Sequence, residues 1–411
     1  MRSLIRAAAS PFELSARRAC FASLLALVLA LAGCQVAPPV VTPPAPAHAV
    51  FTRTTYAELP GWNDDHVAAA WPAFRVGCEA LVARAKTAET WRDVCAKAAS
   101  VDGSDDAAAK RFFEAHFTPY RVTGSDGTDR GLVTGYYEPL LHGSRTRSDV
   151  YPAPLFAPPD DLLTVDLATV YPELRGKRVR GRLDGRRVLP YWTRADIEAG
   201  KAETQGKALV FVDDPVDAFF VQIQGSGRVA LDDGTTLRVG YADQNGQPYR
   251  SVGRVLIERG ELAPGEASMQ AIREWGRTHP EALPALLDEN PSYVFFRVVA
   301  PPVPGSLEAS IDGPIGSLGV PLLAARTIAV DPKAIPLGAP VYLATTEPLS
   351  DAPLARLVMA QDTGGAIRGP IRADFFWGFG DEAGRQAGRM KQQGAMWLLW
   401  PNDAPLPGAA P

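Results

Sequence analysis

The sequence is poor in histidine and cysteine, and both shortages narrow the chemistry open to it. It has five histidines and four cysteines among 411 residues. The histidines are scattered and never stand at metal-ligand spacing from a cysteine or a carboxylate, which argues against a metal site. Gly225-Ser226-Gly227 is too short for a phosphate-binding loop and opens no clear helix. We therefore expect neither a metal nor a cofactor.

Long apolar runs are also scarce, and the one near the N-terminus is too short to cross a bilayer. Two arginines precede it and small residues follow it, which is typical of a removable export signal. Cys34 stands directly after Leu31-Ala32-Gly33, a junction that resembles the lipobox of bacterial lipoproteins. The resemblance implies a signal peptide over residues 1–33 and acylation of Cys34, which would anchor the chain to a membrane. The alternative is an ordinary signal peptide with a coincidental cysteine.

Excess positive charge is absent too. The sequence has a formal net charge of −4, and removal of the first 33 residues would make it about −7. Such a balance disfavours binding to nucleic acid, which depends on clustered lysine and arginine. It suits a neutral or mixed-charge polymer, and the remaining length suffices for two domains of about 150 residues each.

Only Cys78 and Cys95 would remain in the processed chain, because Cys20 leaves with the signal and Cys34 is acylated. Two cysteines in an oxidising compartment usually pair. Their segment has the pattern of two helices joined by a turn, which could bring the sulfurs together. We predict a disulfide between them; the alternative is two separately buried thiols.

The pattern along the chain predicts a mainly β protein with helices near its N-terminus. Proline-rich residues 34–49 predict a semi-rigid tether, and residues 64–116 have helical periodicity. Later helices are expected at 250–260 and 268–290, and residues 401–411 as a disordered tail. The 37 prolines and 37 glycines between short apolar runs favour a barrel or sandwich over a parallel doubly wound sheet. The runs predicted as strands are 132–137, 218–223, 294–299, 327–330, 341–343, 357–360 and 396–400.

Three aspartates in the C-terminal third have distinctive settings. Asp331 follows an apolar run, Asp362 precedes Thr363-Gly364-Gly365, and Asp374 precedes Phe375-Phe376-Trp377-Gly378. A single aspartate at a strand end is usually a turn residue. Three of them within 44 residues indicate carboxylates gathered at the rim of a sheet.

These residues resemble the 3D domain, named for its three aspartates, over about residues 316–400. The chain after the signal is similar to the membrane-bound lytic murein transglycosylase A family, with ordered matches over about 350 residues. The matching segments are Thr134-Gly135-Tyr136-Tyr137-Glu138-Pro139, residues 191–197, residues 219–227, residues 240–246 and residues 290–296.

The resemblance implies a double-psi β-barrel domain built from residues 50–144 and 305–400. A second β-rich, barrel-like domain would be inserted at 145–304, with the substrate groove between the two. It also implies cleavage of the β-1,4 bond between N-acetylmuramic acid and N-acetylglucosamine in peptidoglycan. The C6 hydroxyl of the muramyl residue attacks its own C1, so that no water enters and a 1,6-anhydro end remains.

That reaction needs one carboxyl that first donates a proton and then accepts one. Its pKa must be raised by burial or by a neighbouring negative charge. By motif position Asp374 is the acid/base, with Phe375-Phe376-Trp377 as a desolvating wall. Asp362 would hydrogen-bond to Asp374 and position it, and Asp331 would be a structural or orienting residue. The competing assignment gives Asp362 the catalytic role.

Other residues of the matching segments are candidates for binding sugar. Tyr136, Tyr137 and Trp192 have flat faces able to stack on sugar rings, although such residues are more often part of a core. Glu138 would either cap a turn or bind sugar hydroxyls. Amide and hydroxyl groups for the acetamido substituents would come from Gln222, Gln224, Ser226 and Asn245. Gln222 and Gln224 are expected on one face of a single strand.

Three functions stay open from the sequence. The first is a lytic transglycosylase in an outer-membrane lipoprotein that faces the periplasm, because Gln35 rather than aspartate follows the acylated cysteine. The second is a glycoside hydrolase on the same polymer, in which Glu138 or Asp362 activates water. The third is a glycan-binding lipoprotein without catalysis. Expected partners are peptidoglycan strands, the membrane through the anchor, and other cell-wall enzymes, but no nucleic acid.

Overall fold

The structure is a computed structural model, and it describes residues 48–174, 177 and 179–407. The predicted signal peptide, Cys34 and nearly all of the tether lie outside these residues. Within the described part of the chain, no helix is long and apolar enough to cross a membrane. The predicted disordered tail is wrong for residues 401–407, because the Trp400 indole donates to the Pro405 carbonyl and Leu406 packs against the core.

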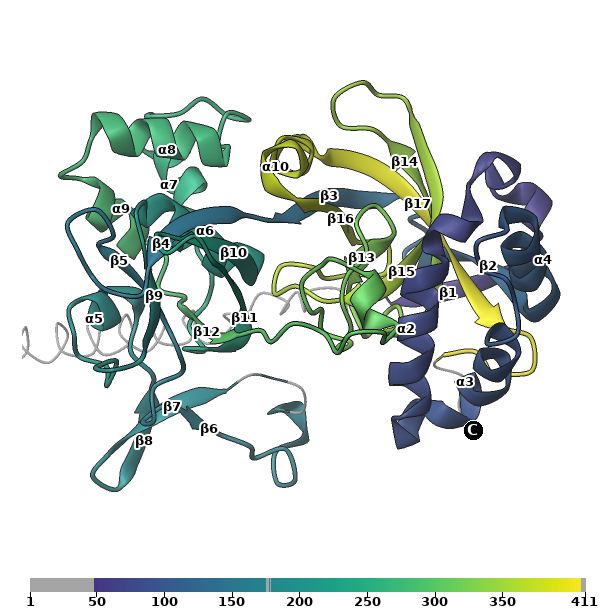
Figure 1. The fold of residues 1–411 in the computed structure, drawn as a ribbon, viewed down its shortest axis with the longest axis horizontal. Helices are drawn as coiled ribbons and strands as arrows, with labels where there is room; N and C mark the ends of the chain where they lie inside the picture. The colour runs from purple at the N-terminus through teal and green to yellow at the C-terminus, as the bar shows by residue number, and fades with distance from the viewer. Residues whose placement is uncertain (1–47, 175–176, 178, 408–411) are drawn as a thin grey trace, which may run out of the picture. The chain divides into compact units, whose positions relative to one another are not determined.

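The first sheet has eight strands in the order β1-β2-β17-β14-β15-β13-β16-β3. An additional pairing of β17 with β3 closes the six strands from β17 to β3 into a ring, so that this part of the sheet is a barrel (Figure 1). The strands are β1 (Ala49–Arg53), β2 (Phe117–Gly124), β3 (Gly131–Glu138), β13 (Thr327–Val330), β14 (Pro340–Thr346), β15 (Pro353–Asp362), β16 (Ala373–Phe379) and β17 (Lys391–Pro401).

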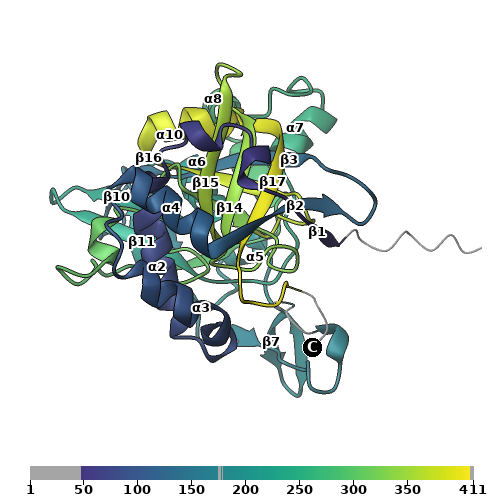
Figure 2. The ribbon, with the colours of Figure 1, turned by 90° about the vertical axis from the view of Figure 1, so that its right-hand side faces the viewer.

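Three helices precede the barrel strands in the chain, as the periodicity predicts: α2 (Trp71–Val82), α3 (Ala85–Ala98) and α4 (Asp106–His116). They gather on one side of the barrel strands in Figure 2. Trp71, Phe74 and Phe113 form a cluster of packed rings that joins α2 to α4. The predicted disulfide is confirmed, since Cys78 on α2 and Cys95 on α3 are bonded and buried.

The chain between β3 and β13 forms the insert, built on a six-stranded sheet in the order β12-β11-β10-β4-β9-β5. Its first strand already begins at Leu140, so the chain leaves the barrel near Pro139 rather than at residue 144. The insert strands are β4 (Leu140–Ser144), β5 (Ala153–Phe156), β9 (Ala208–Val212), β10 (Ser226–Leu231), β11 (Thr236–Gln244) and β12 (Val294–Val298). A separate three-stranded sheet consists of β6 (Leu163–Thr164), β7 (Arg180–Asp184) and β8 (Arg187–Pro190).

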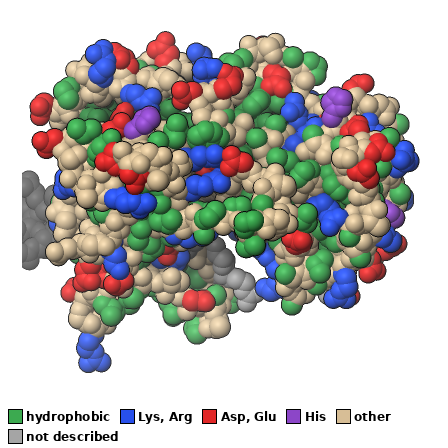
Figure 3. All heavy atoms as spheres, in the orientation of Figure 1, with side chains coloured by type: hydrophobic (Ala, Val, Ile, Leu, Met, Phe, Trp, Pro, Cys, Tyr) green, Lys and Arg blue, Asp and Glu red, His purple; other side chains and the backbone are tan. Residues whose placement is uncertain are grey.

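The helices predicted late in the sequence are present and shorter than expected. They are α7 (Val252–Glu258), α8 (Met269–Thr278) and α9 (Leu283–Asp288). Three further helices were not predicted: α5 (Arg194–Glu198), α6 (Pro215–Gln224) and α10 (Gly380–Arg389). Acidic and basic side chains are interspersed on the face drawn in Figure 3, so that face favours no partner of one charge sign.

The prediction of a strand at 218–223 is wrong, because these residues form most of α6. A short apolar run does not by itself distinguish a buried strand from a buried helix. The flanking residues decide: the Asp214 carboxylate accepts from the Val216 N–H as an N-cap, and Pro215 opens the helix. Gly225 ends it at a φ of 81°, a conformation that favours glycine. The other six predicted strands are confirmed as β3, β12, β13, β14, β15 and β17.

The disulfide between α2 and α3 should stabilise the fold measurably. It closes a loop with a sequence separation of 17, and the chain-entropy account assigns such a loop about 3 kcal/mol. We expect Cys78→Ala/Cys95→Ala to lower the free energy of unfolding by about that amount in urea titrations. Reductant should destabilise the wild type to a similar degree and leave the double variant unchanged; an equal effect on both proteins would contradict the assignment.

Candidate active site

Two of the three aspartates lie in one row across neighbouring barrel strands. Ala329 on β13 is paired with Asp362 on β15 and, on its other side, with Asp374 on β16. Thr134 on β3 continues the row, because it is paired with Asp374. Residues directly opposite one another project from the same face of a sheet. The two carboxylates therefore flank Ala329, whose single methyl group adds little bulk between them.

Asp374 is held through one of its two carboxyl oxygens. The Thr134 hydroxyl donates to Asp374 Oδ1 at 2.6 Å. Thr134 Oγ1 in turn accepts from Arg372 Nη2 at 2.8 Å. Among the described residues, Asp374 Oδ2 has no hydrogen-bond partner, so this oxygen is the one available to a ligand.

The surroundings of Asp374 raise the pKa of its carboxyl to about 6. Burial is the largest cause, and the negative charge of Asp362 acts in the same direction. The hydrogen bond from Thr134 and the positive charge of Arg372 act in the opposite direction. A carboxyl with such a pKa can be neutral or ionised near neutral pH, as a group that both donates and accepts a proton must be.

From the described residues, Asp362 accepts three hydrogen bonds. Its Oδ1 accepts from the Ser317 N–H at 2.9 Å and from the Ser317 hydroxyl at 2.8 Å. Its Oδ2 accepts from the Tyr136 hydroxyl at 3.1 Å. Burial raises the pKa of Asp362, and the donors oppose that shift. The predicted hydrogen bond from Asp362 to Asp374 is wrong: within the described chain Asp362 acts on Asp374 through its charge, and the bonded neighbour is Thr134.

Asp331 lies at the end of the middle strand of the row, but its carboxylate serves the backbone. It accepts from the Lys333 N–H at 3.1 Å and from the Gly369 N–H at 2.9 Å, and the residue is 8% exposed. These bonds hold the turn after β13 and attach it to the loop before β16. They give Asp331 a structural contact without a bond to Asp362 or Asp374 among the described residues.

The aromatic block after Asp374 is divided between the two faces of β16. Phe376 lies on the face of Asp374, where its ring is 5.1 Å from that of Tyr136. Phe375 and Trp377 alternate to the other face, with their rings 4.9 Å apart. Only Phe376 can therefore act as the desolvating wall that the sequence suggested for all three residues.

Tyr137 also differs from its neighbour Tyr136, because it lies on the opposite face of β3. Its backbone N–H donates to Gln224 Oε1 at 3.2 Å, and its hydroxyl lies 3.4 Å from the sulfur of Met269. It borders a cavity of about 170 Å³ lined by residues of β3, α6, α10 and the start of α8. The position links the barrel to the insert and turns the ring away from Asp374.

Glu138 is enclosed in an ion-pair cluster and is 1% exposed. Its carboxylate accepts from Arg228 Nε at 2.7 Å and lies 3.5 Å from Arg238 Nη2. Both arginines also pair with Asp312. The cluster attaches the end of β3 to β10 and β11. Of the two roles considered for Glu138, the structure favours the structural one.

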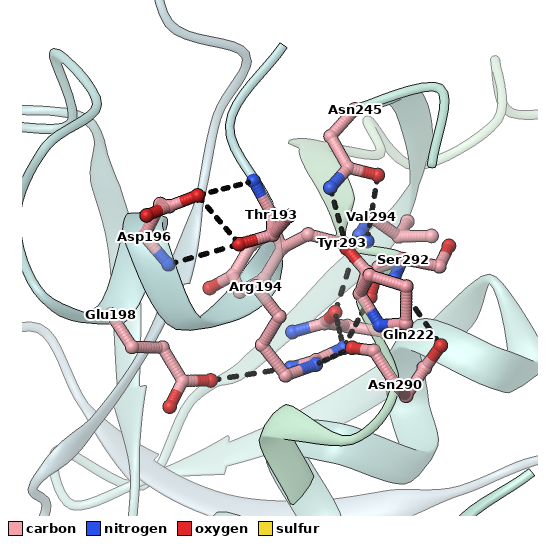
Figure 4. Close-up of polar contacts among 11 residues, drawn as sticks. Thr193, Arg194, Asp196, Glu198, Gln222, Asn245, Asn290, Ser292, Tyr293 and Val294 are labelled. Carbon is pink, nitrogen blue, oxygen red and sulfur yellow. Dashed lines mark hydrogen bonds and ion pairs between the residues drawn. The ribbon is translucent and has the colours of Figure 1, made fainter. Parts of the chain in front are cut away.

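Gln222 and Asn245, predicted to bind sugar, are instead bonded within the insert (Figure 4). Gln222 Oε1 accepts from Arg194 Nη2 at 2.7 Å and from the Val294 N–H at 3.2 Å. Asn245 Nδ2 donates to the carbonyls of Trp192 and Pro291. Both side chains are buried, with 7% and 1% of their surface exposed. Their amides stabilise the fold and leave little surface for a ligand.

The remaining sugar-binding candidates have mixed surroundings. Gln224 lies on α6 and bonds to Tyr137, so it shares no strand face with Gln222. Ser226 is buried at the start of β10. The Trp192 ring is covered by the Arg182 guanidinium at 3.6 Å. The predicted groove between the domains and the sugar-binding roles of these residues stay predictions.

Three residues of the site were not predicted: Thr134, Arg372 and Ser317. Period-2 alternation could have placed Thr134 on one face with Tyr136, two residues along β3, and Arg372 on one face with Asp374, two residues along the chain. Nothing in the sequence marks Ser317, which reaches Asp362 from 45 residues away. Within the described residues, no three His, Cys, Asp or Glu side chains gather as metal ligands would.

Comparisons with known proteins agree with this arrangement. Residues 132–297 match the family model described as the MltA specific insert domain, and residues 326–400 match the 3D domain. The sequence is 34% identical over 295 residues to membrane-bound lytic murein transglycosylase A of Escherichia coli K12, with 68% of each chain covered. The chain belongs to the MltA family.

Solved MltA structures share the fold. The crystal structure of MltA from Neisseria gonorrhoeae superposes with a TM-score of 0.76 at 40% identity, covering 90% of this chain and 97% of that one. Escherichia coli MltA with bound chitohexaose superposes with a TM-score of 0.60 at 27% identity, covering 89% and 94%. The resemblance noted in the sequence is thereby confirmed, as is the barrel with an inserted domain. The 3D match contains all three aspartates.

The raised pKa of Asp374 has a consequence for stability. Because the folded pKa lies above the ordinary value of 3.8, the ionised carboxylate destabilises the fold at pH 7. We expect Asp374→Asn to raise the free energy of unfolding there by up to about 3 kcal/mol. The gain should shrink as the pH falls below about 6 and vanish below about 3.8, where the wild-type carboxyl is neutral in both states. Urea unfolding at several pH values measures it, with exposed Asp149→Asn as control.

A variant Asp374→Asn that is less stable than the wild type at pH 7, or a gain that does not depend on pH, would contradict a buried carboxylate at this position.

Proposed function

We propose that this protein is a peptidoglycan lytic transglycosylase in which Asp374 is the single acid/base. It cleaves the β-1,4 bond between N-acetylmuramic acid and N-acetylglucosamine and leaves a 1,6-anhydro end. The observation that carries the proposal is one carboxyl with a pKa of about 6, held through Oδ1 and unbonded at Oδ2. Membership of the MltA family and the chitohexaose complex of the Escherichia coli relative support it.

The reaction returns Asp374 to its starting state. Neutral Asp374 donates its proton to the glycosidic oxygen while the bond from C1 to that oxygen breaks, and the electron pair leaves with the N-acetylglucosamine. Positive charge develops at C1 and the ring oxygen of the muramyl residue. The C6 hydroxyl then attacks C1 and loses its proton to the Asp374 carboxylate. The new bond from O6 to C1 closes the anhydro ring, and no water is consumed.

The neighbours of Asp374 suit both halves of this cycle. The negative charge of Asp362 raises the pKa of Asp374 and would stabilise the positive sugar ring. The Thr134 bond and the Arg372 charge stabilise the carboxylate that must act as base. The opposing effects leave the pKa of Asp374 at about 6, close enough to neutral pH for the carboxyl both to donate and to accept a proton.

A hydrolase would need a second carboxylate to activate water, and the two candidates are poorly placed for it. Glu138 is enclosed by two arginines. Both oxygens of Asp362 already accept hydrogen bonds from Ser317 or Tyr136. An intramolecular nucleophile removes the need for such a base, which favours the transglycosylase.

We place the enzyme at the periplasmic side of the outer membrane, anchored through acylated Cys34. The lipobox-like junction and Gln35 support this location, and the curated relatives are named membrane-bound. Metabolic labelling with a radioactive fatty acid, followed by membrane fractionation, tests it. Label that persists in Cys34→Ala, or a wild type that remains soluble, would contradict it.

The products decide between the transglycosylase and the hydrolase. Digestion of purified sacculi, followed by mass spectrometry of the released muropeptides, should give 1,6-anhydro ends. We expect Asp374→Asn to lower the rate by roughly 10³-fold, with Asp149→Asn as the matched control. Reducing ends would favour the hydrolase, and sacculus binding without turnover would favour the binding protein.

The pH dependence tests the roles of the two aspartates. Since the acid form of Asp374 is required, kcat/KM should fall about tenfold per pH unit above about pH 6. Asp362→Asn removes a negative charge that raises the Asp374 pKa, so the decline should begin at a lower pH. If Asp362→Asn were instead as inactive as Asp374→Asn at every pH, the competing assignment of Asp362 as the acid would be favoured.

A further inference from the structure

Arg372 is a half-buried cation whose N–H groups donate to β3 and β16, the strand beside Asp374 and the strand that carries it. Its Nη1 donates to the carbonyls of Leu132 and Ala373, the first at 3.3 Å. Its Nη2 donates to the Thr134 hydroxyl oxygen at 2.8 Å. Within the described chain no carboxylate forms an ion pair with it, and burial lowers its pKa while the charge of Asp374 raises it. Its guanidinium is thus fixed to the backbone of β3 and β16.

The hydrogen bond from Arg372 occupies one lone pair of Thr134 Oγ1 and leaves the hydroxyl proton to be donated elsewhere. A hydroxyl has one proton and two lone pairs, whereas a guanidinium only donates. When Thr134 Oγ1 accepts from Arg372, its own proton finds an acceptor in Asp374 Oδ1, 2.6 Å away. In this arrangement Thr134 Oγ1 both accepts and donates, and Oδ1 of Asp374 is an acceptor in both protonation states.

We propose that Arg372 is a positioning residue that fixes the direction of the hydrogen bond from Thr134 to Asp374, so that the transferable proton of Asp374 resides on Oδ2. The inference rests on the proposed acid role of Asp374. With Oδ1 occupied as an acceptor, a neutral carboxyl carries its proton on the oxygen that has no partner in the described structure. That oxygen can face the glycosidic bond.

Without Arg372, the bond between Thr134 and Asp374 could reverse. Asp374 would then carry its proton on Oδ1 and donate it to Thr134, in an orientation unproductive for the leaving group. Arg372 also stabilises the carboxylate left after proton donation, through its charge. The other titratable groups facing Asp374 are Asp362 from β15 and Tyr136 from β3.

A double-mutant cycle tests this chain of bonds. We expect Arg372→Met and Thr134→Val each to lower kcat on soluble glycan strands about 10- to 100-fold, with KM within about twofold of the wild type. Because Arg372 acts through Thr134, the double variant should be no slower than the slower single variant. Losses that multiply in the double variant would overturn the proposal.

The pH profile gives a second readout that a merely structural role would not move. Arg372→Met and Thr134→Val each remove an influence that lowers the Asp374 pKa, so the decline of kcat/KM should begin at a higher pH. Arg372→Lys retains the charge, and should keep the decline near its wild-type position while kcat stays low. Thr134→Ser retains the hydroxyl, so its kcat and the pH at which its kcat/KM declines should both match the wild type. A profile unmoved in Arg372→Met would contradict the proposal.

Arg356→Met is the matched control, because Arg356 is another partly buried barrel arginine, pairs with Glu347 outside the site, and lies over Phe375 on the face of β16 opposite Asp374. It should leave the pH profile unchanged. If Arg372→Met fails to fold, as judged by circular dichroism, Arg372→Lys takes its place in the cycle with Thr134→Val, and losses that multiply there would likewise overturn the proposal. The two proposals can be contradicted independently. An active Asp374→Asn variant contradicts the acid role of Asp374. An inactive Asp374→Asn variant, together with losses that multiply in the Arg372→Met/Thr134→Val double variant, contradicts only the role of Arg372.

Discussion

The parallel pairing of β3 with β16 is the constraint on which the site depends. It brings Thr134 to Asp374 across 240 positions of sequence. The intervening chain forms the insert and returns to the barrel at β13, so β3, the strand that closes the barrel, also supplies the hydrogen bond to the acid. A barrel with this pairing undone would retain the 3D segment and its aspartates but would lose the only hydrogen bond that the described residues give Asp374.

The same pairing helps to bury two carboxylates, which lowers the stability of the fold. Together with the pairings of β13 to β15 and β16, which set Asp362 and Asp374 on either side of Ala329, it encloses both carboxylates, and burial raises the pKa of both. Asp362 is compensated by three donors, whereas Asp374 has one. This difference separates the two residues chemically. The donors oppose the rise in the pKa of Asp362, whereas Asp374, with one donor and a pKa of about 6, can exchange a proton near neutral pH.

The sequence predicts those parts of the fold and the site that depend on contacts between residues close together in the chain. Strands β13 and β15, beside Asp331 and Asp362, were predictable because apolar runs bounded by turn residues mark them directly. Strand β16, which carries Asp374, was not among the predicted strands. The apolar run of helix α6 suits a strand equally well, and the signals that distinguish the helix are its Asp214-Pro215 start and its Gly225 stop. Because residues 218–223 form a helix, the expectation that Gln222 and Gln224 share one face of a strand is also wrong.

Contacts at long range account for the rest. The role of Thr134 depends on which strand lies beside β16, and no local pattern contains that information. Glu138 and Asn245 looked like binding residues because polar side chains in matching segments serve either ligands or the fold. The partners that decide between these roles, Arg228 for Glu138 and Pro291 for Asn245, lie 90 and 46 positions away.

Strand β3 shows how one segment serves both domains. Thr134 and Tyr136 project toward the two aspartates. Gly135 and Tyr137 face α10, and a side chain added at Gly135 would lie 2.7 Å from Trp377 Nε1. Tyr137 also contacts α6 and α8 of the insert through Gln224 and Met269. Because successive side chains of a strand point to opposite faces, four consecutive residues of β3 carry both the contacts to the insert, through Tyr137, and the hydrogen bond that holds the acid, through Thr134.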